Sequence, residues 1–321
     1  MSNPDNRVLW DGQRRGWLES WYFIIHDLAT RDAFWLRYTL VSPLEGPAFA
    51  GLWAFAFPHD APPVAVREIF PEGEFSADPF EFLVRIGPGT LRADNATARI
   101  GTGVRAAWNL RYKHYPVTYW AAPPLVRAFS AASFSIPTPR TRFTGTLVIG
   151  DRSWTLDGAP GCQGHFATPS IGRGWTWAHA TEFDEGVGFA EAVSPSPGLM
   201  ASVGVAFDGR TWEGNTLATI PAGRVEGTDW KRTFRAETAE GPVTWEIEAD
   251  PARTAGLEYA DPSGSRIYCY NTLLASSVLR VGDRTLHSHR TTVLEISSEL
   301  PRLDVPLLLR AAEAPGPRPA H

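Results

Sequence analysis

Glu19 is the carboxyl group in this sequence best placed for acid–base chemistry. It belongs to an otherwise apolar segment in which Trp21, Phe23 and Ile25 follow at alternate positions. A β-strand here would hold the carboxyl half-buried on an apolar face. Desolvation favours the protonated form of a carboxyl group, and this form can act as a general acid. The alternative interpretation is structural, with Glu19 anchoring backbone amides or pairing with an arginine.

Three further polar side chains are candidates for catalysis, namely Gln163, His165 and His179. We predict that His165 lies in a glycine-rich turn, where a side chain can reach an exposed position in a cavity. His179 fits two interpretations, a hydrogen-bonded histidine of the core or a catalytic group.

Aromatic residues are abundant, with 13 Trp, 17 Phe and 8 Tyr among 321 residues. Their faces attract a cation by cation–π interaction, worth up to about 2 kcal/mol per ring in a dry site, although they also fill ordinary cores. Because Trp175 and Trp177 share strand parity, we hypothesise that they line one cavity together with Trp21. The residues predicted to contact a ligand are Trp21, Tyr22, Trp35, Trp53, Trp175, Trp177 and Tyr268.

The standard cofactor and metal motifs are absent from the sequence. It has no glycine-rich phosphate loop, no Gly-x-Ser-x-Gly elbow and no His-Glu-x-x-His helix. His287 and His289 could share one strand face, but without a third ligand they are typical of a surface pair. We therefore expect no metal and no cofactor. Cys162 and Cys269 are expected to be reduced, half-buried thiols, with one disulfide between them as the alternative.

Strands must position these residues, because strand patterns dominate the chain. Residues 51–57 and 243–248 alternate between two kinds of side chain with the period of a β-strand. Asp208-Gly209, Gly150-Asp151 and Gly282-Asp283 each separate two short apolar runs, as tight hairpin turns do. We predict an all-β protein made of two antiparallel β-barrels packed side by side.

The length of the chain exceeds what one core usually serves, so two domains are expected. The proline-rich stretch 115–139 would connect them, since proline at this density excludes central strands, and a short helix is expected near 125–132. We place the N-terminal barrel with its connector at 1–139, the C-terminal barrel at 140–310 and a disordered tail at 311–321.

Charge and hydropathy limit the classes of partner and the cellular location that fit this chain. The net charge is −5 and no basic cluster is present, which argues against a nucleic-acid partner. Residues 1–13 lack the layout of a signal peptide and no apolar run is long enough to cross a bilayer, so a cytoplasmic protein is expected. Contact with a membrane surface would be peripheral. The oligomeric state stays open.

Several motifs resemble those of one superfamily. Glu19-Ser20-Trp21-Tyr22-Phe23 looks like the Glu-x-Trp-Tyr opening strand of tocopherol cyclases and of carotenoid hydratases of the hydroxyneurosporene synthase type. Residues 139–147 are similar to the Arg-x-x-Gly-x-Leu strand of their second domain, and residues 174–179 to their Gly…Trp-x-Trp segment. Residues 245–248 and 268–272 are similar to the C-terminal pattern of tocopherol cyclases. Residues 161–165 depart from the Trp-x-Asp-x-Glu of some relatives, which leaves the proton donor open.

The resemblance implies two lipocalin-like barrels with an apolar ligand near their interface, and relatives that include pericyclases without a cofactor. We predict a cofactor-free cyclase, hydratase or pericyclase for a bulky apolar isoprenoid or polyketide-like molecule, with Glu19 or His165 delivering a proton or orienting the substrate. The alternative is a non-catalytic lipophile carrier of the lipocalin type. A carrier's cavity would be uniformly apolar, whereas an enzyme's would hold one or two convergent polar groups with perturbed pKa values.

Overall fold

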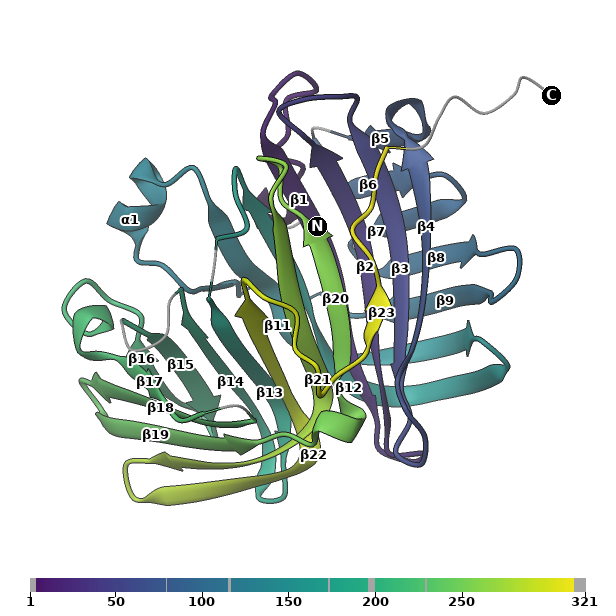
Figure 1. Ribbon diagram of the computed structural model, residues 1–321. Coiled ribbons are helices and arrows are strands. Elements are labelled where there is room, and N and C mark those ends of the chain that lie inside the picture. Colours follow the sequence, from purple (N-terminus) through teal and green to yellow (C-terminus); the bar gives the residue numbers. More distant parts are fainter. Residues whose placement is uncertain are drawn as a thin grey trace.

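The computed structural model describes residues 4–78, 80–114, 117–172, 174–195, 200–228 and 230–314. Two antiparallel sheets, each curled into a barrel-like shape, lie side by side, and one short helix, α1 (Pro124–Phe129), projects from them (Figure 1). The predicted all-β class with two barrel-like domains is confirmed.

The first sheet has 12 strands, in the order β4-β3-β2-β1-β12-β11-β9-β8-β7-β6-β5 with β10 beside β11. Its strands are β1 (Trp17–Asp27), β2 (Asp32–Ser42), β3 (Phe49–Phe57), β4 (Val64–Pro71), β5 (Phe75–Ala77), β6 (Leu83–Ile86), β7 (Gly89–Arg92), β8 (Asn95–Ile100), β9 (Ala106–Tyr112), β10 (Tyr119–Trp120), β11 (Ser133–Ile149) and β12 (Arg152–Thr168). The 3-10 turns η1 (Pro4–Asn6) and η2 (Glu72–Glu74) accompany it.

The second sheet has 11 strands, in the order β16-β15-β14-β13-β22-β21-β19-β18-β17, with β20 pairing both β21 and β23. Its strands are β13 (Thr176–Phe183), β14 (Gly186–Ser194), β15 (Ser202–Phe207), β16 (Arg210–Gly214), β17 (Arg224–Glu226), β18 (Lys231–Thr238), β19 (Gly241–Glu248), β20 (Ala255–Ala260), β21 (Arg266–Val281), β22 (Arg284–Ser298) and β23 (Leu307–Leu309). The 3-10 turns η3 (Ile220–Ala222) and η4 (Pro251–Arg253) accompany it.

The expected domain boundary at residue 140 does not coincide with the change of sheet. The long hairpin β11–β12 belongs to the first sheet, where β12 pairs with β1 and β11 with β9. The second sheet begins at β13. The hairpin β11–β12 is new in sequence at this point, but β11 and β12 find their other pairing partners, β9 and β1, among the strands that precede them.

Proline did not exclude a central strand in the connector. Pro137 and Pro139 lie inside β11, next to register shifts between Ser135, Thr138 and Thr141 where the ladder is irregular. A missing N–H is tolerated at such irregularities. The expected helix is present as α1, and residues 115–116 lie outside the described residues.

The predicted hairpin turns are confirmed at all three places. Asp208-Gly209 joins β15 to β16 with φ values of 50° and 74°, the left-handed conformation that such turns require. Gly150 and Gly282, with φ values of 63° and 55°, start the turns that follow β11 and β21. Short-range turn chemistry therefore set these pairings.

The expected glycine-rich turn at 161–165 is instead part of strand β12, facing β1. Here glycine permits close approach rather than chain reversal. A Cβ atom on Gly161 would lie 2.0 Å from the carbonyl oxygen of Ile24, and one on Gly164 would lie 2.1 Å from the ring of Tyr22. Both glycines thus let β1 side chains and backbone lie directly against β12.

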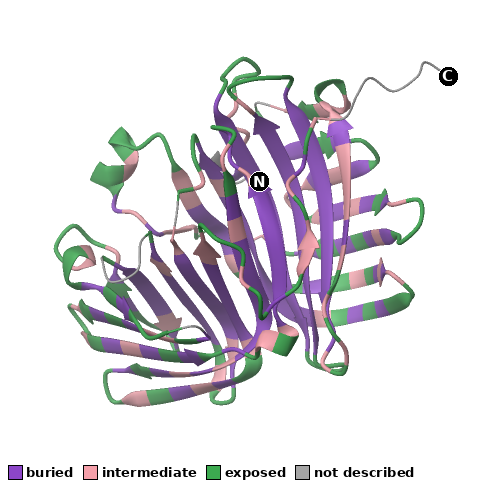
Figure 2. Cartoon of the chain, viewed as in Figure 1, coloured by how far each residue is buried: buried purple, intermediate pink, exposed green. Residues whose placement is uncertain are grey.

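Strand β1 is buried on both faces, as the purple strands at the centre of Figure 2 show. Trp21, Phe23 and Ile25 pack in the core of the first barrel. Tyr22 and Ile24 pack in a separate core between the sheets. The alternating sides of one strand therefore serve two different interiors.

The C-terminal segment was expected to be disordered from residue 311. Ala312 is buried and packs with Leu18, Val41 and Phe49, so the described part of this segment, up to residue 314, contacts the first sheet. Residues 315–321 lie outside the described residues.

Candidate functional site

A cavity of about 410 Å³ lies between the two sheets, with α1 and the residues before it forming part of its wall. Its lining is mainly apolar. The aromatic lining residues are Tyr22, Trp35, Phe134, Phe166, Trp175, Trp177 and Tyr259. The cavity therefore contains four of the side chains predicted to contact a ligand, those of Tyr22, Trp35, Trp175 and Trp177.

Trp21 does not share this cavity with Trp175 and Trp177. Neighbouring positions on a strand point to opposite faces, so Tyr22 faces the cavity while Trp21 faces the first barrel. The indole of Trp21 stacks on His165, with ring centroids 4.9 Å apart, and its Nε1 donates to the carbonyl oxygen of Asn6 at 3.0 Å.

Glu19 is fully buried in the first barrel, not half-buried as expected. Its Oε1 accepts hydrogen bonds from the amide of Leu9 and from His165 Nε2, at 2.8 and 2.9 Å. Its Oε2 accepts from the amide of Trp10 at 2.8 Å and from Trp17 Nε1 at 3.3 Å. Glu19 thus anchors backbone amides, the structural alternative considered above.

Gln163 and His165 complete this buried cluster beside the N-terminal segment. Gln163 Nε2 donates to Asn6 Oδ1 at 3.0 Å, and the amide of Asn6 donates to Gln163 Oε1 in return. His165 Nδ1 lies 3.0 Å from the carbonyl oxygen of Asp5. Glu19, Gln163 and His165 are all absent from the lining of the cavity. Their hydrogen bonds hold η1 inside the first barrel.

Glu295, on β22, is the carboxyl group that does line the cavity. Trp175 Nε1 donates to its Oε1 at 2.6 Å, and the Cys269 thiol is a further partner. Burial raises the pKa of Glu295, while the nearby Arg37 charge and these hydrogen bonds oppose the shift. The sequence signal for Glu295 was a lone acid between Leu294 and Ile296, and Glu295 was not among the predicted site residues.

Arg37 brings a positive charge to the same wall from β2. Its guanidinium donates to Ser20 Oγ and to the hydroxyl of Tyr259, which comes from β20 in the second sheet. Tyr259 is buried, and desolvation raises the pKa of its hydroxyl well above the ordinary value. Neither residue was predicted from the sequence, although an arginine within the aromatic run 34–38 was a usable signal.

His179 lies behind the aromatic wall and is not a lining residue. Its Nδ1 is 2.6 Å from Glu191 Oε2, and Trp177 Nε1 donates to the other carboxyl oxygen of Glu191. Burial lowers the pKa of His179 to about 3 and raises the pKa of Glu191 well above its ordinary value. Both effects favour the neutral forms, so this pair orients the Trp177 indole without placing a charge there.

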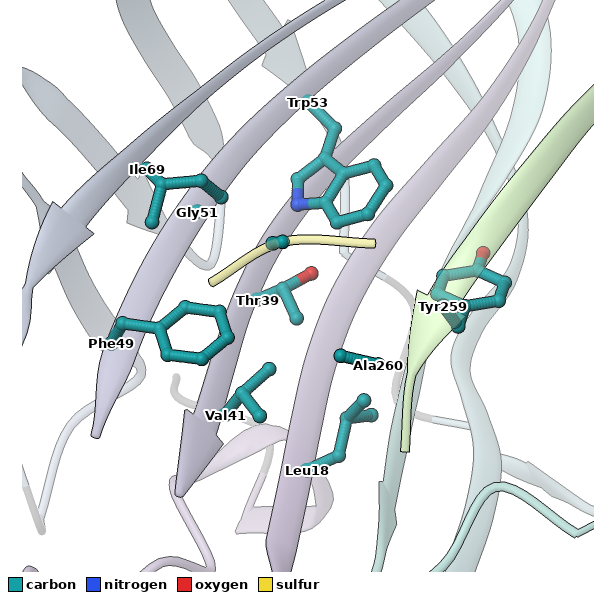
Figure 3. Close-up of a pocket in the computed structure, with 10 residues that line it drawn as sticks. Leu18, Thr39, Val41, Phe49, Gly51, Trp53, Ile69, Tyr259 and Ala260 are labelled. Carbon is teal, nitrogen blue, oxygen red and sulfur yellow. The ribbon is translucent and has the colours of Figure 1, made fainter. Parts of the chain in front are cut away.

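Trp53 faces a separate hollow of about 20 Å³ beside Gly51 and Tyr259, drawn in Figure 3. This volume suits about one water molecule rather than an organic ligand. Tyr268 is half-buried and packs against the core of the second barrel. The structure therefore separates Trp53 and Tyr268 from the large cavity.

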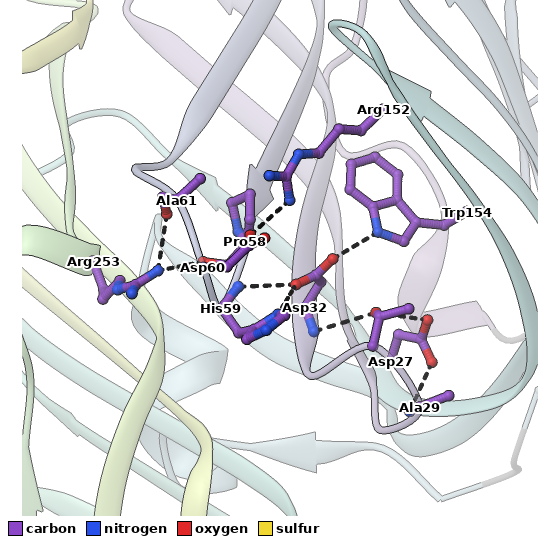
Figure 4. A network of polar contacts seen from close by, with 11 residues as sticks. Asp27, Ala29, Asp32, Pro58, His59, Asp60, Ala61, Arg152, Trp154 and Arg253 are labelled. Atoms are coloured by element: carbon purple, nitrogen blue, oxygen red, sulfur yellow. Dashed lines mark hydrogen bonds and ion pairs between the residues drawn. The ribbon is translucent and has the colours of Figure 1, made fainter.

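A polar network around Asp32 joins several turns of the first sheet (Figure 4). Asp32 accepts hydrogen bonds from the amide of His59 at 2.8 Å and from Trp154 Nε1 at 2.7 Å. Nearby, Arg253 of η4 donates to the carbonyl oxygens of Pro58 and Ala61, at 2.9 and 3.0 Å. None of these residues lines the cavity, and their contacts connect turns to one another and to the second sheet.

Other candidate groups have structural partners. His287 Nδ1 and His289 Nε2 pair with Glu185 and Asp184 at the surface, at 2.5 and 3.3 Å. Cys162 and Cys269 are buried free thiols, so they form no disulfide with each other.

Within the described ranges, no group of three or more His, Cys, Asp or Glu side chains could hold a metal ion. In the same ranges no helix has the length and apolarity needed to cross a membrane.

Comparison of the sequence with those of known proteins finds relatives but no family. No protein-family model matches the chain. Two uncharacterized proteins of Mycobacterium tuberculosis, from strains CDC 1551 / Oshkosh and H37Rv, are each 28% identical to it over 281 residues, which cover 84% of this chain and 82% of theirs.

Two solved structures are similar to the chain at 11% sequence identity. One is a protein from Nitrosomonas europaea provisionally named AttH, with a TM-score of 0.57, covering 88% of this chain and 93% of that chain. The other is kievitone hydratase from Nectria haematococca, with a TM-score of 0.50, covering 89% and 90%. The chain has a two-domain lipocalin-like fold. At this identity the likeness concerns the fold alone.

Proposed function

We propose that this protein is a cofactor-free enzyme that binds a bulky apolar isoprenoid or polyketide-like molecule in the cavity between its sheets and catalyses its cyclisation or hydration. In this proposal Glu295 is the proton donor, in place of Glu19 and His165. The observation that carries the proposal is a buried carboxyl group on an otherwise aromatic wall.

The environment of Glu295 suits a general acid. Burial raises its pKa, which increases the fraction that is protonated as the pH approaches neutrality. Trp175 donates to Oε1, so this hydrogen bond leaves Oε2 available to the proton. Transfer of that proton to an alkene carbon would leave a carbocation in the substrate and a carboxylate on Glu295.

The aromatic wall would stabilise that cation. Trp175 and Trp177 line the cavity on the same side as Glu295, since Trp177 is the register partner of Glu295 on neighbouring strands. Cation–π attraction contributes up to about 2 kcal/mol per desolvated ring. Attack by water, or ring closure followed by loss of a proton from the new cation, would then consume the cation. The proton released in either case would return to the Glu295 carboxylate and restore the acid. One structural neighbour is a hydratase, which keeps water addition among the proposed reactions.

The second candidate is a non-catalytic carrier of lipophilic molecules. The large share of apolar side chains in the lining favours it. Glu295, Arg37 and Tyr259 favour the enzyme, because a carrier does not need an acid with a raised pKa in its cavity.

Turnover by a Glu295→Gln variant tests the proposal. The protein is incubated with a panel of isoprenoid and polyketide-like alkenes, and products are detected by mass spectrometry as an added water or as a cyclised isomer. Glu295→Gln keeps an acceptor for Trp175 but removes the acidic proton, so turnover should fall at least about a hundredfold. Glu258→Gln is the matched control, because Glu258 is also buried but pairs with Arg266 outside the cavity.

Two outcomes would contradict the proposal. Tight binding of panel members without any turnover would favour the carrier. Undiminished turnover in Glu295→Gln would remove Glu295 from the mechanism.

A further inference from the structure

Arg37 is a buried cation in the wall of the cavity. Only 6% of the surface of Arg37 is exposed to solvent. On the sheet it lies between Tyr22 of β1 and Trp53 of β3, which are its register partners on the two neighbouring strands. A charge in this position has lost most of its hydration, so it needs compensation from neighbouring groups.

The compensation within the protein is incomplete. Aromatic rings surround the guanidinium, at 4.9 Å from Trp35, 5.3 Å from Trp53 and 5.1 Å from Tyr259. Its Nε and Nη2 donate to Ser20 Oγ, each at 3.1 Å, and its Nη1 donates to the Tyr259 hydroxyl. All of these partners are uncharged. No carboxylate of the described residues lies within ion-pair distance of Arg37.

The terminal nitrogens of Arg37 keep hydrogen-bonding capacity. A guanidinium has five N–H groups, and the three bonds above leave one N–H on Nη1 and one on Nη2. Two N–H groups on the paired terminal nitrogens match the two oxygens of a carboxylate. A further donor is close by, because the buried Nε1 of Trp35, two residues away on the same strand face and also in the lining, has no partner.

We propose that the ligand of this cavity carries a carboxylate at one end and that Arg37 binds it, which makes the substrate class an apolar carboxylic acid. This inference rests on the proposed function, since it concerns the ligand of the same cavity. The Trp35 N–H is positioned to add a hydrogen bond to the same head group. The apolar chain of the ligand then extends along the aromatic wall toward Trp175 and Trp177.

Glu295 is the acidic group that faces the cavity with Arg37, and it could oppose a second negative charge. Burial raises the pKa of Glu295, which favours its neutral form and weakens that repulsion. Tyr22 and Tyr259, the other titratable lining groups, are also held neutral, because burial raises the pKa of each well above its ordinary value. The net charge of the wall is therefore positive when Glu295 is protonated.

A comparison of an acid with its ester tests this inference. The probes are cis-parinaric acid, a fluorescent polyene carboxylate, and its methyl ester, titrated into the wild-type protein at neutral pH. A charge-assisted bidentate contact should make the acid bind about ten- to a hundredfold more tightly than the ester. This measurement needs no variant, so it does not depend on whether a substitution folds.

Variants then assign the preference to Arg37. Arg37→Met should abolish the preference for the acid and leave the affinity for the ester within about twofold. Arg67→Met is the matched control, because Arg67 also stacks on Trp53, at 4.9 Å, but does not line the cavity. Arg37→Lys keeps the charge but lacks the two parallel N–H donors of the guanidinium, so it should retain part of the preference for the acid. Circular dichroism establishes that each variant is folded.

The outcomes separate this inference from the proposed function. Equal affinities of acid and ester in the wild type, or a preference that survives in folded Arg37→Met, would overturn the carboxylate site and leave the apolar cavity intact. Failure of both probes and of the alkene panel to bind would instead contradict the proposed function. A preference that is lost in Arg37→Met and kept in Arg67→Met would establish the site.

Discussion

Buried polar side chains on the two faces of β1 have different surroundings and different roles. On one face, both oxygens of Glu19 accept hydrogen bonds in the filled interior of the first barrel. On the other face, the hydroxyl of Tyr22 is buried at the cavity and has no partner in the structure. The filled face has its hydrogen bonds satisfied by the chain itself, whereas the cavity face keeps donors unused. Around β1, the unused donors of Tyr22, Trp35 and Arg37 therefore lie on the side of the cavity, where a ligand could use them.

The same comparison explains the roles of the other polar residues. His165 lies on the filled side with Glu19, and both of its ring nitrogens are hydrogen-bonded within the protein. Arg37 faces the cavity and keeps two N–H groups. We infer that Glu19 and His165 stabilise the first barrel, while Arg37 and Glu295 act on the ligand. The predictions below test this division.

The largest expected effect is on stability. Glu19→Ala would leave two backbone amides and His165 without their acceptor inside the barrel, so the free energy of unfolding should fall by about 3–5 kcal/mol. Urea denaturation measures this change. Affinity for cis-parinaric acid, measured on the folded fraction, should stay the same, because Glu19 does not line the cavity.

Glu246→Ala is the control for Glu19→Ala. Glu246 pairs with Arg280 at the exposed surface, and such a pair contributes at most about 1 kcal/mol. Similar losses in the two variants would mean that the buried cluster around Glu19 has no special structural role.

An intermediate effect is expected from His26, on the inter-sheet face of β1. Its Nε2 donates to the carbonyl oxygen of Leu273 in the second sheet at 2.8 Å, and burial lowers its pKa to about 4. In the unfolded chain the pKa of histidine is about 6.5, so the unfolded state binds more protons between these values. The free energy of unfolding should therefore fall as the pH drops from about 6.5 to about 4, by up to about 3 kcal/mol.

The His26→Gln variant isolates this contribution. Gln can still donate to Leu273 but does not titrate, so stability should depend less on pH in that window. The difference between wild type and variant cancels the contributions of buried carboxyls that both proteins contain. Parallel pH profiles for the two proteins would argue against a neutral, buried His26.

The smallest effect concerns the rim of the cavity. In α1, Val126 lines the cavity, while Leu125 and Phe129 are 57% and 86% exposed. We propose that these two apolar side chains make peripheral contact with a membrane surface. Replacing both with Ser should slow transfer of cis-parinaric acid from lipid vesicles by about threefold, because less apolar area contacts the bilayer.

Stopped-flow fluorescence measures the transfer rate, and equilibrium affinity in detergent-free buffer serves as the control. That affinity should not change, since neither exposed side chain lines the cavity. An unaltered transfer rate would dismiss α1 as a membrane contact.

Local signals predicted much of the fold. The turns at Gly150, Asp208-Gly209 and Gly282 depend on residues next to one another in sequence, and their backbone conformations follow from those residues. Strand parity also grouped Trp175 with Trp177 in one wall. Long-range pairing was not predictable in this way, because nothing local near Thr141 indicates that β11 joins the sheet of residues before it.

The site was harder to predict than the fold for the same reason. Parity shows that Trp21 and Tyr22 face opposite ways but not which face meets a cavity. Glu19 and Glu295 are both acids in largely apolar segments of the sequence. Only the packing of one sheet against the other distinguishes the acid that is enclosed by backbone amides from the acid that is open to a ligand.

The distant pairing of β1 also affects how the chain folds during its synthesis. β1 pairs with β12, and the bond between Glu19 and His165 spans 146 residues. During synthesis, β1 to β4 can form a meander, but one edge of β1 stays unpaired until β12 has left the ribosome. An exposed apolar strand edge promotes aggregation, and distant pairing slows folding. The first half of this protein thus presents an unpaired apolar edge during synthesis, and we expect chaperones to protect it until β12 pairs.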